Sequence, residues 1–324
     1  MKKRRWLWIG LALVVVVLLV GGLVSQTPWG KAATTNMLTS DTLENYGKDP
    51  GLGVRQLHKQ GYTGKGVTVA IIDQPMRRSH PEYRDAPITY YAVWPDEPGM
   101  KASNTSMHGP AVTSLLMGKS IGVAPDVTLH YVAMPSWAAD QAAHAEALYK
   151  LIEVNRSLPE GKKIRAVSIS DGVDEREKNP EAFRKAIADA EAAGIWVFTV
   201  DFPDLRLAPL GIDPYKDKDK PANYRPASWV KGLPSGPEKY LWFPTESRTR
   251  ATEMEPGLYH YDAEGGMSWG MPYLVGVVAL GLQEDPALTR ENAVKYLWES
   301  ATPWKSGRII NPPGFVEMVK KNKR

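Results

Sequence analysis

Four short apolar runs, rich in β-branched residues, constrain the fold of this chain more than any other feature. They are Val67–Asp73, Val127–Met134, Lys163–Ser170 and Gly194–Asp201. Between them lie helical stretches at residues 138–155 and 179–193, the second opening with Asn-Pro-Glu and ending before a glycine. Strands that alternate with helices in this way predict a three-layer α/β fold with a doubly wound, mostly parallel sheet. Functional residues of such a sheet lie beyond the carboxyl ends of its strands.

Three polar residues stand at positions that suit acyl-transfer chemistry. Asp73 ends the first apolar run, His108 opens a helix, and Ser268 lies in the glycine-rich turn GGMSWG before an apolar helix that extends to about Leu282. This chemistry needs a nucleophile, a base that takes its proton and a carboxylate that orients the base. Taken singly, each residue has a plain structural explanation, as a loop acceptor, a helix-end histidine or a turn serine. The three together, in the order Asp…His…Ser, predict a catalytic triad.

The residues around these three positions resemble the motifs of the subtilisin-like serine peptidases. The matching segments are Gly61–Asp73, Ser79–Tyr83, His108–Gly118, Ile121–Met134, Ala166–Gly172 and Gly265–Leu280. The resemblance covers roughly residues 52–320 and implies a subtilisin-like fold and an endopeptidase. It also implies that Ser168, Ser170 and Gly172 line the cleft and pair with an extended peptide substrate.

Several residues depart from the pattern of that family. Gln74 and Pro75 follow the aspartate where Thr or Ser and then Gly are usual, and Pro110 replaces the Thr after His-Gly. In the serine turn, Met267 and Trp269 flank Ser268 in place of Thr and Met. We therefore expect a divergent member of the family.

The largest departure concerns the oxyanion hole. The family carries an Ala-Gly-Asn turn after the strand that here is Gly194–Val200, whereas this chain continues with Asp201-Phe202-Pro203-Asp204. Loss of the asparagine donor costs roughly 10²–10³ in rate in such enzymes. Asn223, the nearest downstream asparagine, is the candidate substitute. Asp171 and Asp201 also follow strands and are candidate charges in the cleft.

Two other functions stay open at this point. The altered turn and the missing asparagine favour a pseudo-peptidase, which would bind a peptide or partner protein without cutting it. An esterase on an unrelated α/β scaffold is the other alternative. The order of the three residues argues against that scaffold.

The N-terminus predicts a membrane anchor. Residues 1–5 form a basic stub, and residues 6–24 are an uncharged apolar run that spans roughly 28 Å as a helix, close to the thickness of a bilayer core. Basic residues before the span predict a cytoplasmic N-terminus and an outward-facing remainder. Residues 25–51 are then a tether and residues 52–324 the peptidase domain. Secretion after cleavage of a signal peptide is the alternative.

The composition limits the classes of partner that the chain is expected to bind. The chain has 40 basic and 36 acidic residues, and without the four cations of the N-terminal stub the remainder is balanced at 36 each. Net charge therefore gives no indication of a nucleic-acid partner, and we expect a peptide or protein substrate. No cysteine is present. The chemistry requires no cofactor, and structural calcium, which the resemblance allows, is assigned to no residues. Residues 202–236, rich in Pro, Asp and Lys, are expected to form a surface loop.

Overall fold

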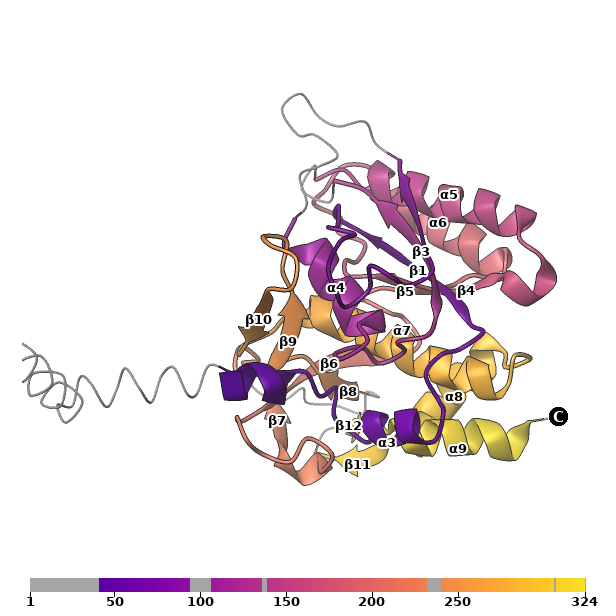
Figure 1. Cartoon of the computed structure of the whole chain (residues 1–324). Coiled ribbons are helices and arrows are strands. Elements are labelled where there is room, and N and C mark those ends of the chain that lie inside the picture. The colour runs from indigo at the N-terminus through magenta and orange to yellow at the C-terminus, as the bar shows by residue number, and fades with distance from the viewer. Residues whose placement is uncertain (1–40, 94–105, 136–138, 232–239, 306, 324) are drawn as a thin grey trace, which may run out of the picture. The chain divides into compact units, whose positions relative to one another are not determined.

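The computed structural model describes residues 41–93, 106–135, 139–231, 240–305 and 307–323 (Figure 1). The chain divides into a unit that ends at Asn45 and a body, Tyr46–Arg324. Residues 41–45 of the first unit are helical. All elements named below belong to the body.

A five-stranded parallel sheet in the order β2-β3-β1-β4-β5 forms the centre of the body. Its strands are β1 (Thr68–Asp73), β2 (Ile88–Ala92), β3 (Thr128–Ala133), β4 (Ile164–Ile169) and β5 (Trp196–Phe198). All six residues of β1 are buried, as expected of a central strand covered on both faces. The four apolar runs of the sequence are therefore confirmed as the four strands β1, β3, β4 and β5.

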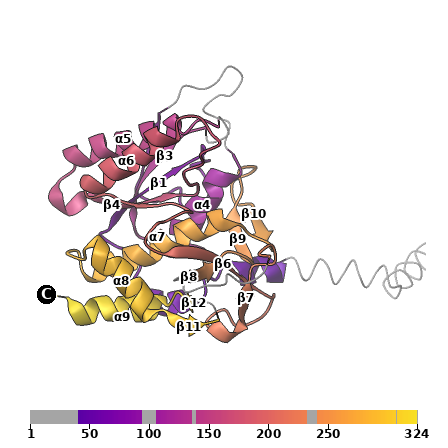
Figure 2. The same ribbon diagram turned by 180° about the vertical axis from the view of Figure 1, so that it is seen from behind.

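Helices cover both faces of this sheet, which confirms the predicted three-layer α/β fold (Figures 1 and 2). On one face lie α5 (Ala142–Ser157) and α6 (Pro180–Ala192), and on the other lie α4 (His108–Met117) and α7 (Met267–Glu284). Asn179 occupies the N-cap position of α6, but its side-chain amide donates to Asp140 instead of capping the helix. Gly194 ends that segment in the left-handed region, with φ of 83°.

A second sheet, β11-β12-β8-β6-β7, packs against the other side of α7. Its strands are β6 (Arg206–Ile212), β7 (Tyr224–Pro226), β8 (Tyr240–Pro244), β11 (Thr302–Trp304) and β12 (Gly307–Ile309). The expectation that residues 202–236 form a surface loop is wrong for β6, whose last five residues are buried. The polar residues that flank this run on both sides hide its apolar character in the average composition.

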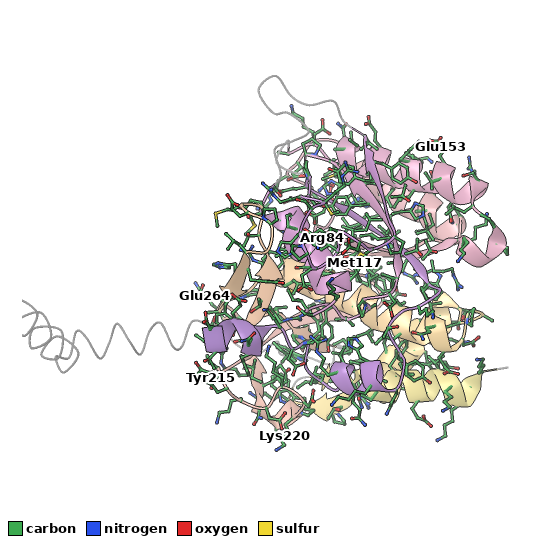
Figure 3. The ribbon with its side chains drawn as sticks, in the orientation of Figure 1. Arg84, Met117, Glu153, Tyr215, Lys220 and Glu264 are labelled. Atoms are coloured by element: carbon green, nitrogen blue, oxygen red, sulfur yellow. The ribbon has the colours of Figure 1, made fainter. Side chains whose placement is uncertain are left out.

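Smaller elements complete the body. They are α3 (Val54–Lys59), the short helices Glu160–Lys162 and Pro221–Asn223, the hairpin of β9 (Arg248–Ala251) and β10 (Tyr259–Asp262), α8 (Arg290–Ser300) and α9 (Pro312–Asn322). The side chains in Figure 3 show the resulting contrast. Met117 at the end of α4 is buried, whereas Glu153, Tyr215 and Lys220 reach the surface.

No helix in the described part of the body is both long and apolar enough to cross a membrane. The predicted anchor at residues 6–24 lies outside the described residues, as do the basic stub and the first part of the tether.

Candidate active site

Asp73 and His108 form a hydrogen-bonded pair at the carboxyl edge of the parallel sheet. Asp73 ends the central strand β1 and is only 6% exposed. Its Oδ1 lies 2.7 Å from Nδ1 of His108 and also accepts from the backbone N–H of Gln74 at 2.7 Å. His108 is the first residue of α4, where the Ser106 hydroxyl oxygen accepts its backbone N–H at 3.0 Å. The pair has the geometry in which a carboxylate orients an imidazole base.

The charges around His108 favour its protonated form. Burial alone would lower its pKa, but the Asp73 carboxylate raises it by charge and by hydrogen bonding. The charge of the Arg250 guanidinium lowers the pKa of His108, and the charge of Asp171 raises it. The net result is a pKa above the usual 6.5. Two further charged residues therefore influence the base.

Ser268 lies in the first turn of α7, as the sequence predicts. The helix begins at Met267, directly after Gly266, whose backbone is extended. Pro272 lies four residues further along and has no N–H to give to the carbonyl of Ser268. That carbonyl instead accepts the hydroxyl of Ser170 at 3.1 Å. The serine turn is thereby tied to the end of β4. Among the described residues, the hydroxyl of Ser268 makes no hydrogen bond to His108.

Trp269, one of the departures in the sequence, fills the space beside the imidazole. Its ring centroid lies 5.2 Å from that of His108, and its indole N–H donates to Asp262 at 2.9 Å. The Arg250 guanidinium lies over the same indole, 5.3 Å from the ring centroid. Sequence reasoning noted the tryptophan but missed Arg250 and Asp262, which come from the β9–β10 hairpin and lie in no recognised motif.

The three predicted substrate-binding residues fall into different environments. Ser170 lines a cavity of about 220 Å³ together with Asp73 and His108. Ser168 lies two residues deeper on β4, is only 1% exposed and is therefore placed inside the sheet. Gly172 is buried and its carbonyl accepts the side-chain amide of Gln141. Of the three, only Ser170 lines the cavity.

The turn after β5 offers a carboxylate where the family has an asparagine. The N–H of Val200 donates to the carbonyl of Asp171, and Oδ2 of Asp201 accepts the N–H of Val173 at 3.1 Å. Asn223 is placed elsewhere, because it lies in the short helix before β7 and its amide donates to the carbonyl of Asp217. The structure therefore does not bring the predicted oxyanion donor to the site.

A second histidine–carboxylate pair lies in the same cavity and was missed by sequence reasoning, which gave His144 no role. Nε2 of His144 lies 3.3 Å from Oδ2 of Asp171, and both residues line the cavity of Asp73 and His108. The two residues come from α5 and from the end of β4. Only the sheet topology brings them together, so no local signal in the sequence could have shown the pair.

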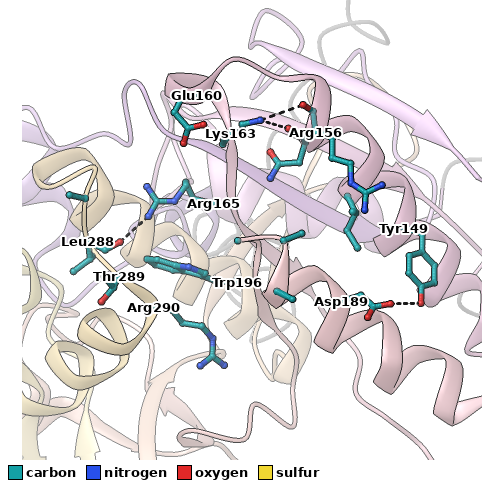
Figure 4. A pocket seen from close by; sticks show the side chains of 16 residues that line it. Tyr149, Arg156, Glu160, Lys163, Arg165, Asp189, Trp196, Leu288, Thr289 and Arg290 are labelled. Atoms are coloured by element: carbon teal, nitrogen blue, oxygen red, sulfur yellow. Dashed lines mark hydrogen bonds between the residues drawn. The ribbon is translucent and has the colours of Figure 1, made fainter.

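A larger hollow, of about 980 Å³, lies away from these residues, between α5, α6 and the start of α8 (Figure 4). Three of the four cationic side chains that line it are already engaged. Arg165 donates to the carbonyls of Pro286 and Leu288, Lys163 donates to the carbonyl of Asn155, and Arg290 pairs with Glu191 and Asp204. We therefore place the functional site at the smaller cavity.

Metal ligands do not gather within the described part of the chain, where no group of three or more histidine or acidic side chains could hold an ion. Structural calcium, which the resemblance allows, therefore has no candidate set of ligands among the described residues.

Comparisons with known proteins show which proteins this chain is similar to. Residues 64–200 match the model of the subtilase family of peptidases. A search of curated protein sequences finds no significant match.

Solved structures share the fold at low identity. Fervidolysin from Fervidobacterium pennivorans, described as a keratinolytic enzyme related to subtilisin, superposes with a TM-score of 0.62 at 16% identity, over 85% of this chain and 47% of its own. The patellamide maturation protease PatG gives a TM-score of 0.60 at 17% identity over 83% and 96%. The prenylagaramide maturation protease PagA gives 0.57 at 19% over 82% and 98%. Residues 64–200 thus resemble the subtilase family, and the chain shares the fold of these solved proteases.

Proposed function

We propose that this chain is a serine endopeptidase that hydrolyses peptide bonds with Asp73, His108 and Ser268. The single observation that carries the proposal is the 2.7 Å hydrogen bond between Asp73 and His108 at the cavity whose Ser170 is bonded to the backbone of Ser268. A solved PatG macrocyclase domain holds a peptide, which supports a peptide as the substrate class here. No cofactor takes part in this chemistry.

In the proposed reaction, Oγ of Ser268 attacks the peptide carbonyl and its proton passes to Nε2 of His108. Asp73 accepts the N–H at Nδ1 and stabilises the imidazolium that forms. His108 then gives the proton to the leaving amine, and water hydrolyses the acyl-enzyme by the same steps in reverse. The backbone N–H of Ser268, in the first turn of α7, has no partner within the helix and is the donor available to the oxyanion.

The oxyanion side of the site predicts slow turnover. Asp201 presents a carboxylate in the turn that carries an asparagine in the family, and a carboxylate accepts hydrogen bonds instead of donating them. We therefore expect a rate roughly 10²–10³ below that of a peptidase with the complete set of donors.

A fluorophosphonate probe tests the assignment of the nucleophile. The full-length chain should be labelled, and the variant Ser268→Ala should not. Ser157→Ala is the matched control, because Ser157 lies on α5 and its hydroxyl donates to the carbonyl of Val154. Labelling that persists in the Ser268→Ala variant would refute the assignment.

A pseudo-peptidase is the second candidate, and a specific observation favours it. The hydroxyl of Ser268 makes no hydrogen bond to His108 among the described residues, and Asp201 offers no donor. In this case the folded chain would leave casein intact and resist the probe, yet would still bind extended peptides.

The proposed location is the outer face of the cell membrane. Lys2–Arg5 would remain in the cytoplasm, the run Trp6–Val24 would span the bilayer, and the peptidase domain would face outward. N-terminal sequencing of the mature protein from membranes should begin at Met1 or Lys2. A start near Gln26, with the protein in the medium, would replace the anchor by a cleaved signal peptide.

A further inference from the structure

The cavity beside Asp73 and His108 has a polar wall that the proposed reaction does not use. Asp171 and His144 form this wall, whereas the side chains of Ile72, Met134 and Ile169 supply its apolar parts. His144 is only 3% exposed, its ring packs on Phe183 at a centroid distance of 4.6 Å, and its Nδ1 has no hydrogen-bond partner in the described part of the chain. Buried polar atoms are usually paired, so His144 keeps an unfilled hydrogen-bonding position beside the cavity that Asp171 lines.

Asp171 is held in place but remains accessible. Its Oδ1 accepts the N–H of Gly172 at 2.8 Å and its Oδ2 lies 3.3 Å from His144, yet its side chain is 42% exposed. Each carboxylate oxygen accepts more than one hydrogen bond, so both oxygens keep capacity for a ligand. Burial raises the pKa of Asp171, but the hydrogen bond and charge of His144 and the N–H of Gly172 outweigh this, and the net pKa is lowered. The carboxylate is therefore charged at neutral pH.

The described residues around this cavity carry more negative than positive charge. No lysine or arginine is among the described residues that line the cavity. The Asp73 carboxylate is already paired with His108, whereas the only ion-pair partner of Asp171 within the described residues is the imidazole of His144. The carboxylate of Asp201 also lies beside Gly172. Its Cγ is 2.9 Å from the point that a Cβ at Gly172 would occupy.

We propose that this cavity receives a lysine or arginine side chain of the bound peptide, and that Asp171 recognises its positive charge. The inference rests on the proposed function, since it places the basic residue next to the scissile bond. The volume of about 220 Å³ lies below the roughly 300–1,000 Å³ of sites for whole small molecules, so it suits one side chain. The methylene groups of that side chain would lie against Met134 and Ile169 while its cation reaches the carboxylate.

The test measures peptide binding, so that it does not depend on turnover. In the full-length chain with Ser268→Ala, the dissociation constants of fluorescent octapeptides are measured while each position is varied among Lys, Arg, Met, Gln and Glu. At one position, Lys or Arg peptides should bind about 10-fold more tightly than Met peptides, the lower end for a hydrogen bond to a charged group, because Asp171 is partly exposed. The ratio of Lys to Arg affinities shows whether a single ammonium or a planar guanidinium fits better.

Two substitutions assign the effect to Asp171. Asp171→Asn keeps the size and the acceptor for Gly172 but removes the charge, and should abolish the preference for Lys and Arg without weakening Met peptides. Asp171→Lys should turn the preference toward Glu. Asp174→Asn is the matched control, because Asp174 lies on the same loop, is bonded to Arg176 and does not line the cavity. Circular dichroism confirms that each variant is folded.

Equal affinities for Lys, Arg, Met and Gln at every position would overturn the inference, as would equal losses in Asp171→Asn and Asp174→Asn. Probe labelling of the chain with Ser268 intact separates the two proposals. Labelling without a charge preference refutes the inference alone. A basic preference that depends on Asp171 but comes without labelling refutes the peptidase function and leaves the binding site standing.

Discussion

The two halves of the site differ in how closely they follow the family. The proposed acid–base half, Asp73 and His108, lies in the segment matched by the family model and has its hydrogen bond already formed. The proposed nucleophile half, Ser268 with Trp269 and the turn at Asp201, lies at or beyond the end of that segment and departs from the family pattern. The comparison teaches that the chain keeps the segments that place Asp73 beside His108 while it changes those around Ser268.

The physical reason lies in what supports each half. Asp73 ends the central strand of the parallel sheet, and α4 packs on the same sheet, so the pair is fixed by one buried layer. Ser268 depends instead on α7, which lies between the first sheet and the second. Phe243 of the second sheet packs against Gly270 beside Ser268, whereas Arg250 and Asp262 next to Trp269 come from the β9–β10 hairpin, and no motif in the sequence indicates either contact.

The largest expected effect breaks the acid–base half. Asp73→Asn should lower kcat by roughly 10⁴, because an amide that donates to the imidazole stabilises the wrong tautomer. Cleavage of a fluorogenic peptide measures this loss, with a thermal melt to show that the fold is retained. A loss of less than 10-fold would show that the Asp73–His108 pair does not serve the reaction.

A smaller effect tests how the second sheet holds the nucleophile turn. A Cβ added at Gly270 would lie 1.6 Å from the ring of Phe243, which is fully buried on β8. Gly270→Ala should therefore lower the free energy of unfolding by about 3 kcal/mol, the upper end for overpacking of a core. Urea titration measures the change.

Gly266→Ala in the same turn is the control for this substitution. Its Cβ would meet no atom within 4 Å, and its φ of 178° is extended backbone that alanine adopts. It should leave the free energy of unfolding nearly unchanged. Equal stability of the two variants would contradict the close packing of the nucleophile turn on the second sheet.

The smallest expected effect is a shift in the pH dependence of kcat/KM. It tests whether Arg250, which lies beside Trp269, acts on His108 by its charge. Because the base must be neutral, kcat/KM should rise with pH as His108 loses its proton, with a midpoint above 6.5. Arg250 lowers the pKa of His108, so Arg250→Gln should move the midpoint further up. Arg250→Lys keeps the charge and should leave the midpoint unchanged. If the midpoint falls in the Arg250→Gln variant, the charge of Arg250 does not lower the pKa of His108.

Much of the fold could be predicted because its signals are local. The runs that became β1, β3, β4 and β5 are short, apolar and β-branched, and strands buried on both faces require such residues. Asp73, His108 and Ser268 were found at a strand end and at two helix starts, which the structure confirms. The buried strand β6 was missed, because polar residues on both sides dominate the composition of its neighbourhood.

The sequence by itself determined the order of strands and helices, the ends at which the functional side chains stand and the absence of the oxyanion asparagine. Each of these depends on residues close together in the chain. Only the tertiary structure decided that Ser168 is buried, that Asn223 is bonded elsewhere, and that His144 and Asp171 meet in the cavity of His108. The contact of His144 with Asp171 joins α5 to the end of β4, two elements that only the packing of α5 on the sheet brings together.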